Sequence, residues 1–134
     1  MDLFSEPLAI VDLETTGGRA ARDRVTEVGV VLVDGGRVVA EHAWLVHPEV
    51  RIPPFISRLT GIDDGLVADA PPFGARANEL LELLSGRLFI AHNARFDFGF
   101  LRAEFARLDL RFAPRVLCSA RLSRRRQGER EAIW

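Results

Sequence analysis

The chain has 134 residues, which fits one compact domain spanning residues 1–134. Hydrophobic residues make up 48% and charged residues 28%, a balance that excludes a disordered chain, and no apolar run is long enough to cross a membrane. The net charge of −1 gives no general attraction to polyanions, although ten arginines and only three acids lie between Arg87 and Arg126. The acidic N-terminus and the single Cys118 favour a cytoplasmic location.

Three strands are predicted in the first part of the chain. A branched apolar run over residues 8–11 leads into Asp12-Leu13-Glu14 and is typical of a buried strand. A second strand is expected over residues 25–33 and a third over residues 37–46. The Asp34-Gly35-Gly36 sequence between them predicts a tight hairpin, so these two strands should run antiparallel.

Helices and strands are expected to alternate in the second part of the chain. After a short helical turn near residues 55–60, the predicted elements are a helix over 73–84, a strand over 88–91, a helix over 94–108, a strand over 115–118 and a basic helix from Ser119 to about Arg126. This order predicts an α/β fold with a mixed five-stranded sheet and helices on both faces. Because a helical crossover joins neighbouring parallel strands, the fourth strand should lie beside the first.

Three carboxylates are predicted to meet at one end of this sheet. Asp12 and Glu14 are two residues apart on a strand, so their side chains share a face. Asp97 lies in the first turn of the helix that follows the fourth strand, and adjacent parallel strands bring such positions together. An Asp-x-Glu pair alone is more typical of a solvated strand end, but three carboxylates form a hard-oxygen site suited to Mg²⁺ or Mn²⁺.

Two motifs resemble those of the DEDD 3′–5′ exonucleases. The stretch Ile10-Val11-Asp12-Leu13-Glu14-Thr15-Thr16-Gly17 is similar to their first motif, and the stretch from His92 to Leu101, with sequence HNARFDFGFL, is similar to their second. The segments Leu59-Thr60-Gly61-Ile62, Ala70-Pro71-Pro72-Phe73 and Val25-Thr26-Glu27-Val28-Gly29 resemble the branch that contains the proofreading epsilon subunit of DNA polymerase III, the DEDDh branch.

This resemblance implies a ribonuclease H-like fold and two-metal hydrolysis of phosphodiester bonds at the 3′ end of DNA or RNA. Asp12 would bridge both metals, Glu14 would bind one of them and help to place the attacking water, and Asp97 would hold the other metal. Thr15 and Thr16 would contact the terminal nucleotide, while Leu59, Thr60 and Phe96 would line the pocket for the last base and sugar. Asn93 would brace the second motif. We interpret Glu27 as a structural hydrogen-bonding acid.

The family's third motif, a His followed about five residues later by an Asp, is not found in the sequence, which ends at Trp134. The resemblance therefore implies a fold that is truncated at its C-terminus. Such a chain would be a fragment of a longer nuclease, a natural short form that binds nucleic acid or a polymerase without cutting, or one part of a site completed by another chain. An uncovered sheet face would favour a homodimer. The expected partners are a single-stranded 3′ end and a DNA polymerase subunit.

Overall fold

The computed structural model describes residues 5–118 and contains one five-stranded sheet with the strand order β3-β2-β1-β4-β5. The strands are β1 (Leu8–Thr15), β2 (Val25–Asp34), β3 (Arg37–Leu45), β4 (Leu88–Ala91) and β5 (Val116–Cys118). β1, β2 and β3 pair antiparallel, whereas β4 runs parallel to both β1 and β5. The predicted mixed sheet and the placement of the fourth strand beside the first are confirmed.

The β2–β3 hairpin closes as its sequence predicts. Asp34 pairs with Arg37, and the two residues between them, Gly35 and Gly36, have φ angles of 57° and 79°. Positive φ at both central positions matches the right-handed twist of the strands, and glycine adopts it without a steric penalty.

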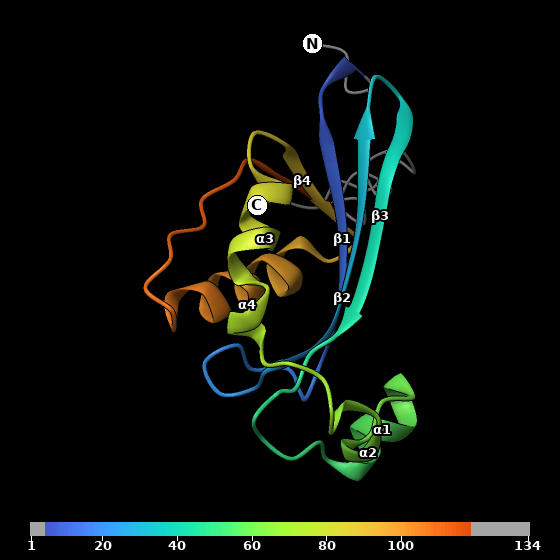
Figure 1. Cartoon of the computed structure of the whole chain (residues 1–134), viewed down its shortest axis with the longest axis vertical. Helices are drawn as coiled ribbons and strands as arrows, with labels where there is room; N and C mark the ends of the chain where they lie inside the picture. Colours follow the sequence, from blue (N-terminus) through green and yellow to red (C-terminus); the bar gives the residue numbers. More distant parts are fainter. Residues whose placement is uncertain (1–4, 119–134) are drawn as a thin grey trace, which may run out of the picture.

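The helices are α1 (Pro54–Thr60), α2 (Asp64–Val67), α3 (Ala77–Leu84) and α4 (Ala94–Ala106), and a 3₁₀ turn at Phe73–Ala75 precedes α3. α3 and α4 lie together on one side of the sheet, and α1 and α2 lie beyond its end (Figure 1). α2 was not predicted, and α3 begins later than the expected residue 73. The basic helix expected from Ser119 lies outside the described residues. No described helix is both long and apolar enough to cross a membrane.

The main core lies between the sheet and the pair α3 and α4. Alternate residues of β1, namely Ala9, Val11 and Leu13, face this core, and so do Leu80 of α3 and Leu101 of α4. This alternation sends Ile10, Asp12 and Glu14 to the opposite face of the sheet.

The helical spacing of Phe98, Leu101, Phe105 and Leu108 predicts that these four residues form the apolar stripe of this helix, and the buried face of α4 differs from that stripe in part. Leu101 and Phe105 are fully buried, but Leu108 is 41% exposed because the helix ends at Ala106. The remaining buried positions include two acids, Asp97 and Glu104. A buried face that contains carboxylates does not have the hydrophobic period by which a helix face is identified.

Candidate metal centre and strand-end pocket

The carboxyl end of β1 presents two acids on the sheet face away from α3 and α4. Asp12 is exposed and lies opposite Gly29 of β2, while Glu14 is partly buried and lies opposite Glu27. Directly opposed residues of antiparallel strands share a face, so Glu27 lies beside Glu14. The pairing shifts register between Glu14 and Thr15, which turns the chain after Glu14 away from the regular ladder.

Asp97 reaches this end of β1 from the first turn of α4. Its side chain is 5% exposed, and its carboxylate accepts hydrogen bonds from the backbone N–H groups of Leu13 and Asn93. Leu13 lies between Asp12 and Glu14 in the chain. The three acids predicted from the sequence therefore come together where β1 ends and α4 begins.

The acids perturb one another electrostatically. Burial, and next the charge of Asp12, raise the pKa of Asp97 to about 7, against the lowering effect of the two backbone hydrogen bonds. Burial also raises the pKa of Glu14, and the charges of Asp12 and Glu27 add to the effect. Like charges held this close favour either a shared proton or a bound cation.

The chemistry of the donor set fits a hard divalent cation, because carboxylate oxygens are the ligands that Mg²⁺ and Mn²⁺ prefer. Over residues 5–118, no group of three or more acidic, His or Cys side chains is close enough together to enclose an ion. Mutual repulsion of carboxylates keeps such side chains apart until a cation neutralises them. The metal-binding roles of Asp12, Glu14 and Asp97 thus stay a prediction that their placement supports.

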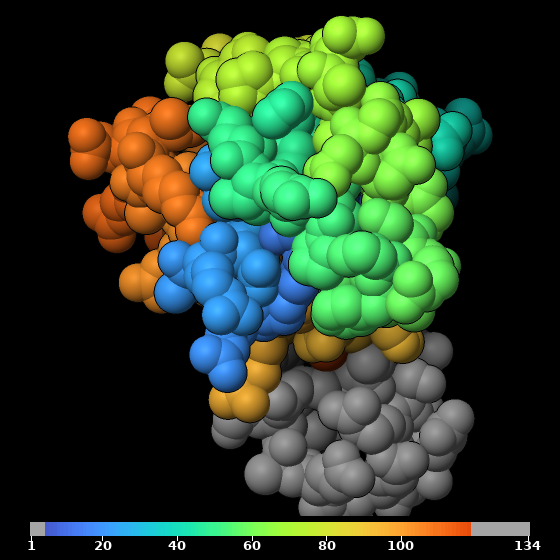
Figure 2. All heavy atoms as spheres, turned by 90° about the horizontal axis from the view of Figure 1, so that it is seen from below, coloured from blue at the N-terminus to red at the C-terminus, as the bar shows by residue number. Residues whose placement is uncertain are grey.

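A pocket of about 250 Å³ opens beside these acids, and we call it the strand-end pocket. It is lined by Leu13, Glu14, Thr15, Gly17, Gly18, Ile56, Leu59, Thr60 and Phe96. Figure 2 views this end of the molecule, where the blue segment after β1 faces the green atoms of α1 and its neighbours. Glu14 belongs both to the acid cluster and to the pocket wall. Four further residues predicted to bind substrate, Thr15, Leu59, Thr60 and Phe96, line this one pocket.

The two remaining predicted site residues are placed differently. Thr16 is 1% exposed and is not among the residues that line the pocket. Its hydroxyl donates to Asp23 Oδ1 at 3.3 Å and accepts from the backbone N–H of Arg24 at 3.0 Å, so it is used within the fold. Asn93 precedes α4 as its N-cap, but its side chain makes no capping hydrogen bond, and its contact with Asp97 runs through the backbone.

Gly17 at the pocket rim packs closely against the side chain of Asp23. A Cβ at Gly17 would meet the carboxylate oxygen Oδ2 of Asp23 at 2.6 Å, closer than real Cβ atoms approach other atoms. Asp23 also accepts a hydrogen bond from the backbone N–H of Arg19 at 2.9 Å. The segment that follows the first motif is therefore folded tightly against itself.

The charge of Glu27 contributes to raising the pKa of Glu14, and the interpretation of Glu27 as a structural acid stays a prediction. The ion pair between Arg24 and Glu104, 80 residues apart, was missed from the sequence. The available signal for Glu104 was its position between Leu101 and Phe105, which places a carboxylate on the buried face of a helix.

Two solved structures with the same fold are complexes of an exonuclease. An ExoI/SSB-Ct complex matches 94% of this chain with a TM-score of 0.83 at 19% sequence identity, and this chain covers 31% of that one. The zinc-bound form of an E. coli ExoI–ssDNA complex matches 94% of the chain with a TM-score of 0.84 at 18% identity, with 30% of that chain covered. These likenesses confirm the ribonuclease H-like exonuclease fold that the sequence predicted.

Several relatives in sequence are named as exonucleases or polymerases. A protein of Mycobacterium tuberculosis named as a putative bifunctional exonuclease/endonuclease is 45% identical over 98% of this chain and 22% of its own length. The 3′-5′ exonuclease DinG of Bacillus subtilis is 34% identical over 86% of this chain and 13% of its own. A PolC-type DNA polymerase III of Caldanaerobacter subterraneus is 36% identical over 86% of this chain and 8% of its own.

The chain spans less than a quarter of the length of these relatives. A family model described as Exonuclease, of the RNase T type, matches residues 9–133, which is nearly the whole chain and includes both motifs. This chain therefore belongs to the RNase T exonuclease family, a family of nucleases.

Proposed function

We propose that this domain hydrolyses phosphodiester bonds one nucleotide at a time from the 3′ end of a single strand, with DNA as the first substrate to test and RNA as the second. The observation that carries the proposal is the shared position of Glu14, which belongs to the acid cluster and also lines the strand-end pocket. A strand end seated in the pocket would lie next to the acids. The 3′–5′ direction is supported by the resemblance of the motifs and by the printed name of the DinG relatives.

Asp12, Glu14 and Asp97 would hold two divalent cations, Mg²⁺ or Mn²⁺, whose chemistry is to stabilise the attacking and leaving oxygens of an in-line displacement. Asp97 would release its proton before it binds a cation, because its pKa lies near 7 in the cation-free fold. Glu14 would also accept a hydrogen bond from the attacking water.

The pocket residues would hold the last nucleotide. Leu59 is 79% exposed on α1 and Phe96 lies at the start of α4, so an unpaired base would find an apolar surface on each of two elements. Stacking on such surfaces does not distinguish one base from another, because every base has a π face. The hydroxyl of Thr60 donates to the backbone oxygen of Ile56 at 2.9 Å and accepts from the backbone N–H of Ile62 at 3.1 Å, so it would shape the pocket wall at the end of α1.

The second candidate is a module that binds a strand end or a polymerase without cutting it. The PolC-type relative supports a polymerase as the partner of such a module.

The test uses single-stranded DNA that is labelled at the 3′ nucleotide and incubated with Mn²⁺. We expect release of the labelled mononucleotide, and we expect Asp12→Ala to lower the rate at least about 100-fold, the size typical of losing one electrostatic stabiliser. Glu82→Ala is the matched control, because Glu82 is an exposed acid of α3, on the other side of the sheet.

Three outcomes count against this function. Release that Asp12→Ala does not affect would point to a contaminating nuclease. Internal cuts in place of mononucleotides would contradict action at a strand end. Strand binding without any release, in Mn²⁺ as in Mg²⁺, would favour the binding module.

A further inference from the structure

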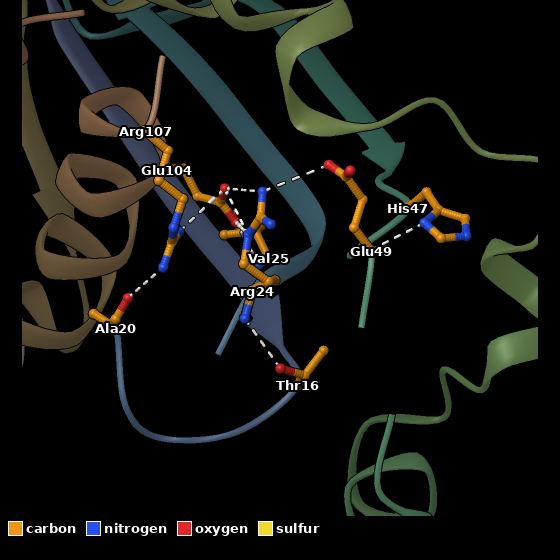
Figure 3. A network of polar contacts seen from close by, with 8 residues as sticks. All are labelled: Thr16, Ala20, Arg24, Val25, His47, Glu49, Glu104 and Arg107. Carbon is orange, nitrogen blue, oxygen red and sulfur yellow. Dashed lines mark hydrogen bonds and ion pairs between the residues drawn. The ribbon is translucent and has the colours of Figure 1, made fainter. Parts of the chain in front are cut away.

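Glu104 is a buried acid with an unusually complete set of partners. Its side chain is 1% exposed, and its carboxylate accepts from Arg24 Nη2 at 2.8 Å, from Arg24 Nε at 3.1 Å and from the backbone N–H of Val25 at 2.9 Å. Arg107 Nη1 lies 3.4 Å from the same carboxylate (Figure 3). The hydrogen bond that Arg24 donates to Glu104, together with the negative charge of Glu104, raises the pKa of Arg24 against the lowering effect of burial.

Asp97 and Glu104 are seven residues apart on α4, so they lie on the same face of the helix, about 10 Å apart along its axis. Asp97 accepts from the backbone of Leu13 on β1, and Glu104 accepts from the backbone of Val25 on β2. Val25 is the partner of Thr15, just beyond the register shift that follows Glu14. Two carboxylates of one helix therefore fix α4 to the end of β1, which carries Asp12 and Glu14, and to the start of the neighbouring strand β2.

Arg24 extends this connection to the pocket wall. Its backbone N–H donates to the hydroxyl of Thr16 at 3.0 Å, and its backbone oxygen accepts from the N–H of Thr16 at 2.9 Å. Its guanidinium also lies 3.8 Å from Glu49, in the segment that leads toward α1. Figure 3 shows Arg24 between Glu104 and Glu49. The segment between Thr16 and Arg24 is thus tied at both ends, and it contains Gly17 and Gly18 of the pocket.

Arg107 holds the middle of the same segment, because its Nη2 donates to the backbone oxygen of Ala20 at 2.8 Å. From these contacts we propose that Glu104 and Arg24 are a pair of positioning residues that set the distance between Asp97 on α4 and the acids Asp12 and Glu14 on β1. The pair would contact neither the nucleic acid nor the cations. It acts through the backbone of residues 13–16 and 25, which it holds against α4. This inference rests on the proposed metal site.

The experiment compares Glu104→Gln with a matched control, Arg87→Gln. The glutamine keeps an oxygen for the N–H of Val25 but removes the charge that pairs with Arg24. Arg87 forms an ion pair of the same length, 2.8 Å, with Asp34, and its 17% exposure resembles the 19% of Arg24. That pair lies at the hairpin end of β2, away from Val25. The control therefore removes a more exposed ion pair of the same sheet, together with hydrogen bonds to the backbone oxygens of Leu8 and Val33, without touching the site.

We expect Glu104→Gln to weaken Mn²⁺ binding by roughly 10-fold or more, the size seen when groups that orient metal ligands are lost. Calorimetry measures this binding. Arg87→Gln should change the affinity for Mn²⁺ by less than about 2-fold. The same difference between the variants should be found when urea is added until both are equally stable. Equal changes in both variants, or none in Glu104→Gln, overturn the proposal. Arg24→Lys, which keeps the charge but not the forked donor, replaces Glu104→Gln if that variant does not fold, and the same expectations hold for it.

Hydrogen exchange of the metal-free protein separates this proposal from the metal site itself. We expect Glu104→Gln to speed the exchange of the amides in residues 13–16 and of Val25 by more than Arg87→Gln does. If the native protein bound no Mn²⁺, the proposed function would fail, and this exchange pattern would still decide whether the pair holds the strand ends. Unchanged exchange at these amides overturns the positioning role.

Discussion

Asp97 is a buried carboxylate placed against two other acids, and its raised pKa lowers the stability of the fold at neutral pH by a measurable amount. An unfolded aspartate has a pKa of about 3.9, whereas burial and the charge of Asp12 bring the pKa of Asp97 in the fold to about 7. Between these two values the folded protein keeps a proton that the unfolded chain has lost. The cation-free fold therefore loses stability as the pH rises from about 4 to about 7.

Asp97→Asn should remove this pH dependence, because the amide carries no charge but keeps an oxygen for the N–H groups of Leu13 and Asn93. In the presence of a chelator at pH 8, we expect the variant to have a free energy of unfolding on the order of 2–4 kcal/mol above that of the native protein. The difference should shrink toward zero near pH 4. Urea unfolding at several pH values measures it.

Asp69→Asn changes the net charge equally at an exposed position and serves as the control. A variant Asp97→Asn that is less stable than the native protein at pH 8 without metal would contradict the account of a repulsive acid cluster. Saturating Mn²⁺ should reverse the order of stability, because a cation stabilises only the fold that binds it.

At the scale of elements, α1 contributes an apolar side chain to the pocket at little cost to the fold. Leu59 is 79% exposed, so its truncation removes few internal contacts, and its effect on stability should stay within about 0.5 kcal/mol. Leu66 of α2 is also exposed, at 52%, but it does not line the pocket. The two leucines therefore form a matched pair for mutation.

We predict that Leu59→Ala weakens binding of a single-stranded 3′ end by about 3- to 10-fold, a loss of roughly 1 kcal/mol, the low end of the stacking contribution per base. Leu66→Ala should leave the affinity unchanged. Fluorescence anisotropy of a 3′-labelled oligonucleotide with Ca²⁺ in place of Mn²⁺ measures binding without cutting. Equal affinities of the two variants would contradict a role for Leu59 in binding the 3′ end.

Most of the elements could be predicted because they depend on local patterns. Apolar runs predicted all five strands, and the two glycines predicted the β2–β3 hairpin. α2 was missed because Gly65 lowers the helix propensity of a four-residue segment, although the side chain of Asp63 caps it by accepting from Leu66 N–H at 2.8 Å. The register shift after Glu14 could not be predicted, since it depends on how β1 meets β2 and not on either strand alone.

At the scale of the whole molecule, the sheet face that carries the acid cluster also carries apolar side chains. Ile10 is 40% exposed there, and its neighbours Val31 and Ile90 are only partly buried. Exposed apolar surface next to a functional site favours association with another protein surface. We therefore predict that the chain forms a homodimer at high concentration.

Light scattering against concentration measures this association, and Ile10→Thr should shift it toward the monomer. Val38→Thr is the control, since Val38 is 60% exposed on β3 and pairs with Val33 at the hairpin end of the sheet. A monomeric native protein at every concentration would contradict the prediction.

The candidate site was predictable where its residues belong to contiguous motifs. Asp12, Glu14 and Asp97 were found from strand and helix periodicity and now lie together at the end of β1, and most of the pocket followed from the resemblance of the motifs. Thr16 was predicted to contact the terminal nucleotide, and its hydroxyl is used inside the fold. Arg24 and Glu104 are 80 residues apart, so no local sequence pattern could predict the contact between them.

The metal site is the central claim, and the position of a bound ion tests it most directly. Crystals grown with Mn²⁺, examined at a wavelength where manganese scatters anomalously, would locate each ion. We predict at least one ion within about 2.0–2.6 Å of oxygens from Asp12 and from Glu14 or Asp97. Ions bound only elsewhere, or none at saturating Mn²⁺, would contradict the assignment of these three acids as a metal centre.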